Sequence, residues 1–195
     1  MDIVIKKLTP ELVEEYIHFF DTTPHDDNLE ENKCYCVVCS NDDCEGKDFS
    51  TAQKRKEYAY QYVKNNNIQG YLAYCGEKIV GWCNANTKGD CLKCSYWRNF
   101  LVYAPLDDIQ AGLKVKSVFC FVIAPQMKRK GIATMLLERV CKDAAEDGFD
   151  MVEAYPFKES AQTCDFGGYV EMYKKLGFYT VLDAPQGIVM RKRLK

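Results

Sequence analysis

The feature that most constrains the fold is the stretch 123–133, where an apolar segment runs into a basic, glycine-containing bend. Upstream, the residues of 113–123 largely alternate between apolar and polar or small side chains, as expected for a β-strand. Downstream of Gly131, apolar residues recur at helical spacing as far as Gly148. Three consecutive cations, Lys128, Arg129 and Lys130, stand where this helix should begin. The sequence therefore predicts a strand–turn–helix unit with positive charge gathered at its turn.

The cations at this bend predict a binding site for an anion. A helix N-terminus already carries partial positive charge, and its first N–H groups have no partners within the helix. Cations placed there are unfavourable by about 0.3 kcal/mol or more each unless an anion is present. A phosphate or diphosphate would satisfy both the N–H groups and the cations. Two alternatives are that Gly131 is only a tight-turn residue and that the basic triplet is only a solvated surface run.

The order of the remaining elements indicates the fold class. Strands are predicted at 2–7, 70–75, 79–85, 113–123, 151–155, 178–182 and 188–190, and helices from Pro10 (with Thr9 as its cap), over 51–66, after Gly131 and after Gly168. Residues 21–50 and 87–112 show no clear period and are predicted to be loops. Such an order predicts an α/β or α+β protein in which helices cover both faces of a central sheet.

The bulk composition narrows the class of protein further. A chain of 195 residues with 47% hydrophobic residues fits one domain with a substantial core. The net charge of −2 gives no general reason to expect nucleic acid, and no run reaches the ~18 apolar residues of a membrane span. The N-terminus has no long apolar run before a small-residue cleavage site. Together with 11 cysteines, this predicts a cytoplasmic protein with mostly reduced thiols.

The element order after residue 70 resembles the GCN5-related N-acetyltransferase (GNAT) superfamily. A hairpin, a long strand, Pro125, the basic turn, a helix, a strand, a short helix with Tyr173 and then Gly177-Phe178 follow one another as in that family. The likeness covers 70–195 well and 1–66 more loosely. The family binds the acetyl-CoA diphosphate on a turn written Gln/Arg-x-x-Gly-x-Gly/Ala, and 128–133 matches it with Lys in first place.

The resemblance implies a single domain of residues 1–195 with a particular sheet. It also implies that different parts of this domain bind the acceptor and acetyl-CoA. The sheet would be mixed but mostly antiparallel, with a splayed central pair of strands. The N-terminal strand, helices and loop of 1–66 would contribute the acceptor site. Residues 70–195 would form the acetyl-CoA-binding core.

The resemblance also implies which residues contact acetyl-CoA. Pantetheine would enter the gap between the splayed strands and pair with the backbone of the first one, and the diphosphate would bind on the turn. By position, the cofactor-binding residues are Phe121, Val122, Ile123, Lys128, Arg129, Lys130, Gly131, Ile132 and Ala133. A backbone N–H near Val122 would hold the oxyanion that forms during transfer.

Two residues are candidates for catalysis. Tyr173, four residues before Gly177, corresponds to the family tyrosine that protonates the departing CoA thiolate, although a core aromatic explains the same spacing. The central strand lacks the Glu that many family members use as a base, and Glu153 on the next strand lies near the expected cleft. The alternative for Glu153 is a solvent-facing or salt-bridged carboxylate, in which case a water chain would take the proton.

Together these residues predict an acetyl-CoA-dependent N-acetyltransferase. It would move the acetyl group directly to a primary amine of a small molecule or peptide, with acetyl-CoA as co-substrate and the amine as acceptor. Neither nucleic acid nor a membrane is expected as a partner, and a homodimer is left open. The alternative is a non-catalytic CoA-binding sensor or interaction module with a Cys-rich metal or redox loop. A nucleotide-binding domain is disfavoured because the turn is not Gly-x-Gly-x-x-Gly.

The cysteines allow two interpretations. Six of them lie at short spacings: Cys34, Cys36, Cys39 and Cys44 within 11 residues, and Cys91 and Cys94 as a Cys-x-x-Cys pair. Thiolates at such spacings can hold zinc, but reduced, partly buried thiols in a loop are the favoured interpretation, and no metal site is predicted. Cys120 on the central strand is conceivable as an acyl carrier, but a buried structural thiol is favoured.

Segment 21–50 also carries unusual charge. It holds nine acids and two bases and therefore a net charge of −7, which would either attract a cationic amine or form a solvated acidic loop. Four aromatic residues could line the acceptor pocket, although core packing is favoured for each: Tyr35, Trp82, Tyr96 and Trp97.

Overall fold

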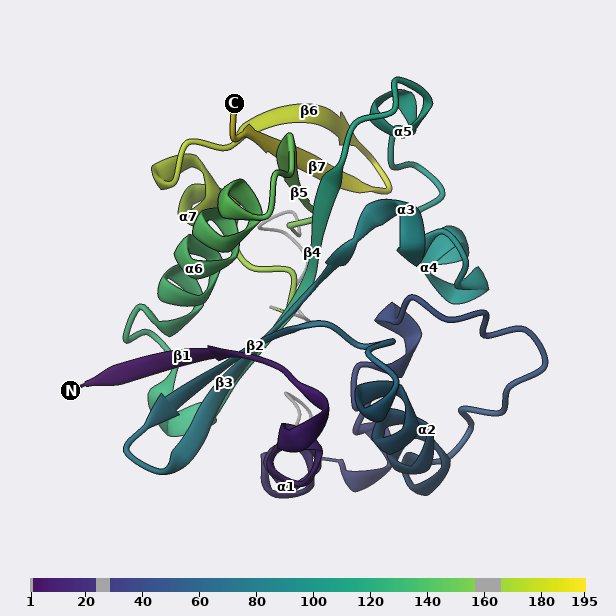
Figure 1. Cartoon of the computed structure of the whole chain (residues 1–195), viewed down its shortest axis with the longest axis vertical. Coiled ribbons are helices and arrows are strands. Elements are labelled where there is room, and N and C mark those ends of the chain that lie inside the picture. The colour runs from purple at the N-terminus through teal and green to yellow at the C-terminus, as the bar shows by residue number, and fades with distance from the viewer. Residues whose placement is uncertain (1, 24–28, 157–165) are drawn as a thin grey trace.

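The computed structural model describes residues 2–23, 29–156 and 166–195 (Figure 1). Its strands form one sheet in the order β1-β2-β3-β4-β5-β7-β6. Their bounds are β1 Ile3–Lys7, β2 Gly70–Cys75, β3 Lys78–Thr87, β4 Val115–Ile123, β5 Met151–Ala154, β6 Tyr179–Ala184 and β7 Gly187–Arg193. Only the β4–β5 pair is parallel among the described strands, since every other neighbouring pair is antiparallel. The predicted mixed, mostly antiparallel sheet is therefore confirmed.

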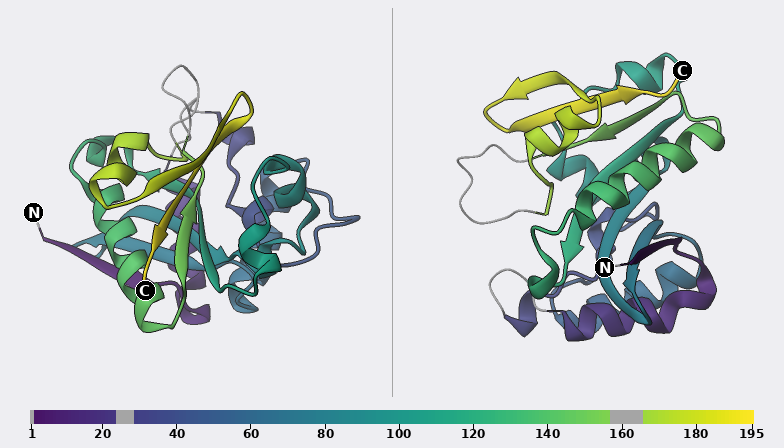
Figure 2. Two further views of the ribbon diagram at one scale, coloured as in Figure 1. Left: turned by 90° about the horizontal axis from the view of Figure 1, so that it is seen from above. Right: turned by 90° about the vertical axis from the view of Figure 1, so that its left-hand side faces the viewer.

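Helices cover both faces of this sheet, as predicted (Figures 1 and 2). On one face lie α6 (Ile132–Glu146) and α7 (Val170–Lys175), and on the other lie α1 (Val13–Thr22) and α2 (Ala52–Lys64). The apolar stripe of α6, including Leu136 and Leu137, packs on Ala73 and other residues of one sheet face. Across the sheet, Tyr16 of α1 packs edge-on against Trp82 with ring centroids 5.0 Å apart. Two separate apolar cores therefore sandwich the strands.

Several local predictions are wrong. Segment 87–112, expected to be a loop, contains α3 (Lys88–Cys91), α4 (Ser95–Phe100) and α5 (Asp107–Gln110). Helices of four to six residues are too short to show a period and owe their stability to tertiary contacts. Thr9 stands at the predicted cap position, but a one-turn 3₁₀ helix, Pro10–Leu12, begins there and the Thr9 side chain makes no cap hydrogen bond. Segment 29–50 is irregular, as predicted, apart from the 3₁₀ turns Glu30–Asn32 and Val37–Cys39.

A bulge in β4 explains the splay of the central strands. Between the pairs Cys83↔Phe121 and Ala85↔Val118, β3 advances by two residues while β4 advances by three. β4 pairs with β5 only over Val115–Val118, although β4 continues to Ile123. A bulge bends its strand and increases the local twist, so β4 leaves β5 at this point. The predicted splayed pair is confirmed, with its open edge beyond residue 118.

Candidate active site

The basic turn ends in a glycine whose backbone only glycine adopts easily. Gly131 has φ +79°, and a Cβ added there would meet nothing within 4 Å, so the constraint is conformational rather than steric. Gly131 is also the N-cap of α6, and it has no side chain with which to cap the helix. The first turn of α6 holds no acidic residue. The first N–H groups of the helix are therefore left for water or for an anion.

A cavity of about 230 Å³ lies beside this turn and reaches the end of β4. Seven of the nine predicted cofactor-binding residues line it: Phe121, Ile123, Lys128, Arg129, Gly131, Ile132 and Ala133. Its remaining wall is made by Met127, Thr134, Gly168, Tyr169 and Met172. The other two predicted residues, Val122 and Lys130, do not line it. The structure thus brings the turn and the open strand edge together around one space, while the binding roles of these residues stay predictions.

The turn carries positive charge that the described residues do not fully neutralise. Arg129 and Lys130 are exposed, and within residues 2–23, 29–156 and 166–195 neither of them forms an ion pair. The guanidinium of Arg129 instead lies 5.8 Å from the ring centroid of Tyr169. The Lys130 ammonium lies 3.9 Å from the sulfur of Met127. An anion entering the cavity would meet these cations together with the N-terminal dipole of α6.

On the open edge of β4, one backbone N–H group already donates a hydrogen bond to a carbonyl oxygen. The N–H of Phe121 donates to the carbonyl of Phe166 with an N···O distance of 2.6 Å, and that of Ala124 donates to Val80 on β3. Because backbone groups alternate along a strand, the N–H of Val122 points toward β3 and that of Phe121 toward the open edge. Two N–H groups near Val122 point toward the open edge, those of Phe121 and Ile123. The Phe121 N–H already holds an oxygen atom there and is therefore the candidate to receive an acyl oxygen.

Tyr173 lies directly behind the wall of the cavity. Its side chain is buried, and its hydroxyl donates to the carbonyl of Gly167 at 2.8 Å, next to the cavity residue Gly168. Burial raises the pKa of Tyr173 well above its ordinary value, so the phenol stays protonated near neutral pH. Tyr173 also shares a core cluster with Phe121. Tyr173 itself does not line the cavity, so its hydroxyl would have to leave Gly167 to reach a thiolate there, and its catalytic role stays a prediction.

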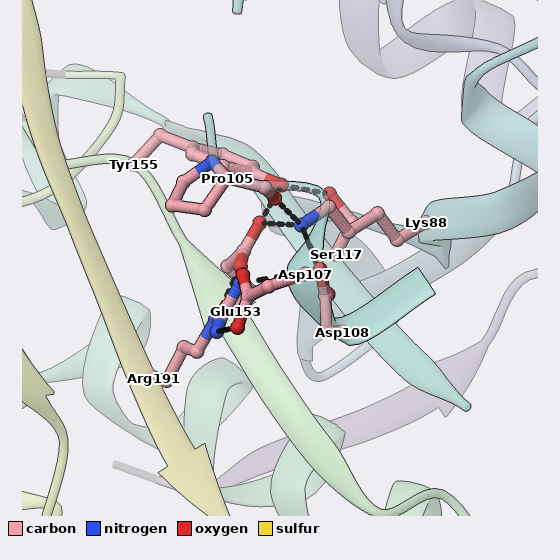
Figure 3. Close-up of polar contacts among 8 residues, drawn as sticks. All are labelled: Lys88, Pro105, Asp107, Asp108, Ser117, Glu153, Tyr155 and Arg191. Atoms are coloured by element: carbon pink, nitrogen blue, oxygen red, sulfur yellow. Dashed lines mark hydrogen bonds and ion pairs between the residues drawn. The ribbon is translucent and has the colours of Figure 1, made fainter. Parts of the chain in front are cut away.

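Glu153 lies in a buried cluster of charges (Figure 3). Its Oε1 is 2.7 Å from the Lys88 ammonium and its Oε2 is 2.7 Å from Nε of Arg191. The Tyr155 hydroxyl donates to Oε1 at 2.7 Å, and Lys88 also pairs with Asp108 at 2.9 Å. This is the salt-bridged arrangement that the sequence left open as the alternative. To act as a base, Glu153 would have to give up a contact with one of these cations.

No local pattern in the sequence marks this cluster. Its members come from α3, α5, β5, β7 and the residue that follows β5, and Asp107 lies 84 residues from its partner Arg191 in sequence. The sequence alone therefore did not point to Lys88, Asp107, Asp108, Tyr155 or Arg191. Only the folded sheet brings them together.

The cysteines of the loop divide into two groups, because Cys34, Cys36 and Cys39 gather near Cys120 while Cys44 lies against Cys94. Cys36 Sγ lies 3.0 Å from Cys120 Sγ, and Cys44 Sγ lies 2.8 Å from Cys94 Sγ. Cys120 is buried, as favoured from the sequence. Among the described residues, no group of three or more His, Cys, Asp or Glu side chains is placed to hold a metal ion.

Of the seven acids of segment 21–50 that the structure describes, four form ion pairs with lysines, one of them Glu30 with Lys33. Asp21 forms an ion pair with Lys56, and two others pair as Asp42–Lys47 and Asp48–Lys54. This pairing favours a solvated loop over a surface that attracts a cationic acceptor. Of the four aromatic candidates, Tyr35, Trp82 and Trp97 are buried in the core, as favoured, and Tyr96 is 44% exposed.

The family model described as the acetyltransferase (GNAT) family matches residues 5–178. The chain therefore belongs to this acetyltransferase family, whose members use acetyl-CoA. The predicted family, an N-acetyltransferase activity and acetyl-CoA as co-substrate are therefore confirmed at the level of the family.

Solved structures show the same fold at low sequence identity. A polyamine N-acetyltransferase of Drosophila melanogaster matches with a TM-score of 0.58 and 14% identity, over 97% of each chain. The PaiA N-acetyltransferase of Thermoplasma acidophilum, solved with coenzyme A, matches at 0.54 and 15% over 99% of each. A mosquito arylalkylamine N-acetyltransferase-like protein matches at 0.60 and 14%, over 98% of this chain and 100% of the other. No curated protein sequence matches the chain.

None of the helices in the described ranges is both long and apolar enough to cross a membrane.

Proposed function

We propose that this acetyltransferase moves the acetyl group of acetyl-CoA directly to a primary amine of a small molecule or peptide. One observation carries the proposal: a single cavity joins the cationic N-terminus of α6 to the open edge of β4. The first feature suits a diphosphate, and the second suits an extended amide chain ending in a thioester. Neighbours named for polyamine and arylalkylamine acceptors support an amine as the acceptor.

In the proposed complex, the first N–H groups of α6 and the side chains of Lys128 and Arg129 hold the diphosphate. Lys130, whose ammonium lies off the cavity wall, contributes through its field rather than by contact. Pantetheine lies along the open edge of β4. Its amides pair with the backbone of Phe121 and Ile123, which faces away from β3.

The thioester carbonyl would take the place that the Phe166 carbonyl occupies now. An oxygen atom already fits 2.6 Å from the Phe121 nitrogen, so an acyl oxygen has room at the same position. The internal contact must open when acetyl-CoA binds. One such preorganised N–H donor contributes about 3 kcal/mol to stabilising an oxyanion.

The reaction then needs two proton transfers. The neutral amine attacks the carbonyl carbon, the oxyanion is held by the Phe121 N–H, and the C–S bond breaks as the carbonyl reforms. Tyr173 gives its proton to the departing thiolate. The proton of the new ammonium leaves to water in this scheme, because Glu153 is held by two cations. An acceptor site built from 1–66, a cytoplasmic location and a homodimer remain predictions.

A coupled assay of acetyl-CoA turnover against a panel of primary amines tests this proposal. We expect thiol release that depends on the amine, and Tyr173→Phe should lower kcat about 100-fold while acetyl-CoA affinity changes little. Tyr179→Phe, at an exposed tyrosine on β6, is the matched control and should keep full activity. Binding of acetyl-CoA without turnover on any amine would favour the sensor alternative. An unchanged kcat in a folded Tyr173→Phe variant would remove Tyr173 from the mechanism.

A further inference from the structure

Two thiol–thiol contacts attach the loop of residues 33–44 to the rest of the protein. The first joins Cys36 to Cys120 on β4, and the second joins Cys44 to Cys94 at the start of α4. The sulfur atoms are 3.0 and 2.8 Å apart, about 1 Å more than in a disulfide bond. All four side chains are buried. Neither contact was visible in the sequence, where the partners lie 84 and 50 residues apart.

The backbone around Cys36 is held in an unusual conformation that supports the first contact. Tyr35 and Cys36 both have positive φ, 45° and 57°, although neither is glycine. Such backbone is strained and persists only where its surroundings hold it in place. Here the Tyr16 hydroxyl donates to the carbonyl of Tyr35 at 2.9 Å, and the Asn86 amide donates to the carbonyl of Cys39 at 2.8 Å. The loop is therefore fixed so that the Cys36 sulfur contacts Cys120.

We propose that Cys36–Cys120 and Cys44–Cys94 are two oxidisable thiol pairs that close to disulfides and lock this loop onto β4 and onto the start of α4. The inference concerns the chain's own thiols and does not depend on the identity of the amine acceptor. It makes the predicted Cys-rich loop a site of reversible covalent modification.

In each pair the hydrogen bonds lower the pKa of one thiol. Hydrogen bonds from the Cys120, Cys34 and Cys39 thiols lower the pKa of Cys36. A hydrogen bond from Cys44, together with backbone N–H groups at the start of α4, lowers the pKa of Cys94 to about 6. The partner thiols, Cys120 and Cys44, have raised pKa values because each donates its proton within the pair. The thiolate is the nucleophile in thiol oxidation, so Cys36 and Cys94 would react first.

A hydroperoxide is a sufficient oxidant, and hydrogen peroxide is small enough to reach buried thiols during local opening. The thiolate attacks one peroxide oxygen, the O–O bond breaks, and a sulfenic acid and a hydroxide ion form; the hydroxide takes a proton from solvent and becomes water. The sulfur of the partner thiol then attacks the sulfenic sulfur, forming the S–S bond and releasing a second water. Overall, two thiols lose two electrons and two hydrogens to one peroxide. A dithiol reductant reverses the change by exchange.

The test is disulfide mapping of the full chain by mass spectrometry, after reduction, exposure to hydrogen peroxide, acid quenching and alkylation. We expect the Cys36–Cys120 and Cys44–Cys94 linkages, each reversed by dithiothreitol. Because each bond closes a long loop, Tm should rise by about 5 °C or more in the oxidised protein. Cys36→Ser should remove the first linkage and part of the Tm rise and leave the second linkage intact.

Cys75→Ser is the matched control, because Cys75 is a partly exposed thiol on β2 without a thiol contact among the described residues. It should keep both linkages and the full Tm rise. The proposal is overturned if wild-type protein stays fully alkylatable after peroxide treatment. It is also overturned if the linkages found join neighbours such as Cys34 and Cys36, or if both expected linkages form with no change in Tm. If a Cys→Ser variant does not fold, the disulfide map of the wild-type protein is sufficient to test the proposal.

Discussion

The cations of the cluster around Glu153 are buried and paired with carboxylates, whereas Arg129 and Lys130 at the turn before α6 are exposed. In the cluster, Lys88 is fully buried and contacts both Asp108 and Glu153 (Figure 3). At the turn, Arg129 and Lys130 are exposed and, within the described residues, have no carboxylate partner. A buried cation must be paired to be tolerated, whereas an exposed one can remain available to a ligand. The difference suggests that the first region serves the fold and the second serves binding.

Removing a charge should therefore lower stability in the Glu153 cluster and lower acetyl-CoA affinity at the turn. Losing one partner of a buried pair leaves an uncompensated charge in a medium that solvates it poorly. Losing an exposed cation changes folding little but removes part of the attraction for an anion. Variants of each region can thus be separated by measuring stability and acetyl-CoA affinity side by side.

The largest effect is expected from Glu153→Gln. It removes the charge that faces Lys88 and Arg191 while keeping the shape of the side chain, and should lower the free energy of unfolding by about 3–5 kcal/mol. Glu146→Gln is the matched control, since Glu146 pairs with Lys142 on the exposed side of α6 and should cost less than about 0.5 kcal/mol. Denaturant unfolding measures both.

A stable Glu153→Gln variant with a large loss of kcat would break the comparison. It would mean that Glu153 acts on the reaction, as its place near the expected cleft allowed, and that its ion pairs contribute little to the fold. A loss of stability with kcat retained in the folded fraction would support the structural role.

Lys116 sharpens the comparison because it is buried on β4 beside other cations. Burial lowers its pKa from 10.5 to about 8, with the Lys7 charge adding to the effect. Below pH 8 Lys116 is protonated in both the folded and unfolded states, and the folded state bears a cost on the order of 3 kcal/mol. Between pH 8 and 10.5 the unfolded chain binds more protons, so this cost fades as pH rises. Lys116→Met should therefore stabilise the protein most at neutral pH and progressively less toward pH 10.5.

The control for this experiment is Lys114→Met, immediately before β4. Lys114 is exposed, and its ammonium lies over the same Phe149 ring at 4.2 Å, against 4.5 Å for Lys116. We expect it to change stability by less than about 0.5 kcal/mol across the same pH range. If the two variants gave the same pH profile, burial would not be the cause of the Lys116 effect.

The double variant Arg129→Ala, Lys130→Ala tests the other side of the comparison. Removing two exposed cations from the turn should weaken acetyl-CoA binding roughly 10-fold to 100-fold, or about 1.4–3 kcal/mol, with little change in Tm. Calorimetric titration at low and high salt should show that the variant has lost much of the salt dependence of the wild type. Lys142→Ala, on the exposed side of α6, should bind acetyl-CoA as the wild type does. An unaltered affinity in the double variant would mean that neither a contact from Arg129 nor the field of Lys130 helps to hold the diphosphate.

The two regions also differ in how far the sequence could predict them. Residues 128–133 are contiguous, and Gly131 with its three preceding cations makes a local pattern that a single sequence reveals. The same is true of the long strand and helix that flank it. The cluster of Lys88, Asp107 and Arg191 has no such pattern, because its partners meet only when β5 and β7 pair and segment 87–112 folds over them. The bulge that opens β4 is likewise set by pairing with β3, which no period in one strand shows.

The smallest effect is expected at Gly131 itself. With φ +79° and no atom within 4 Å of an added Cβ, Gly131→Ala tests backbone conformation without a clash. Left-handed backbone costs a residue with a Cβ about 1 kcal/mol, so the free energy of unfolding should fall by about that amount. Gly46→Ala, in a loop outside the cavity with φ +72° and equally open surroundings, should cost the same. The two variants should therefore differ only in their affinity for acetyl-CoA. Gly131→Ala should lower this affinity, because strain at the N-cap shifts the N–H groups that the diphosphate would contact. Gly46→Ala should leave it unchanged. Equal affinities would show that the turn tolerates this shift, and that the cations rather than the backbone dominate the site.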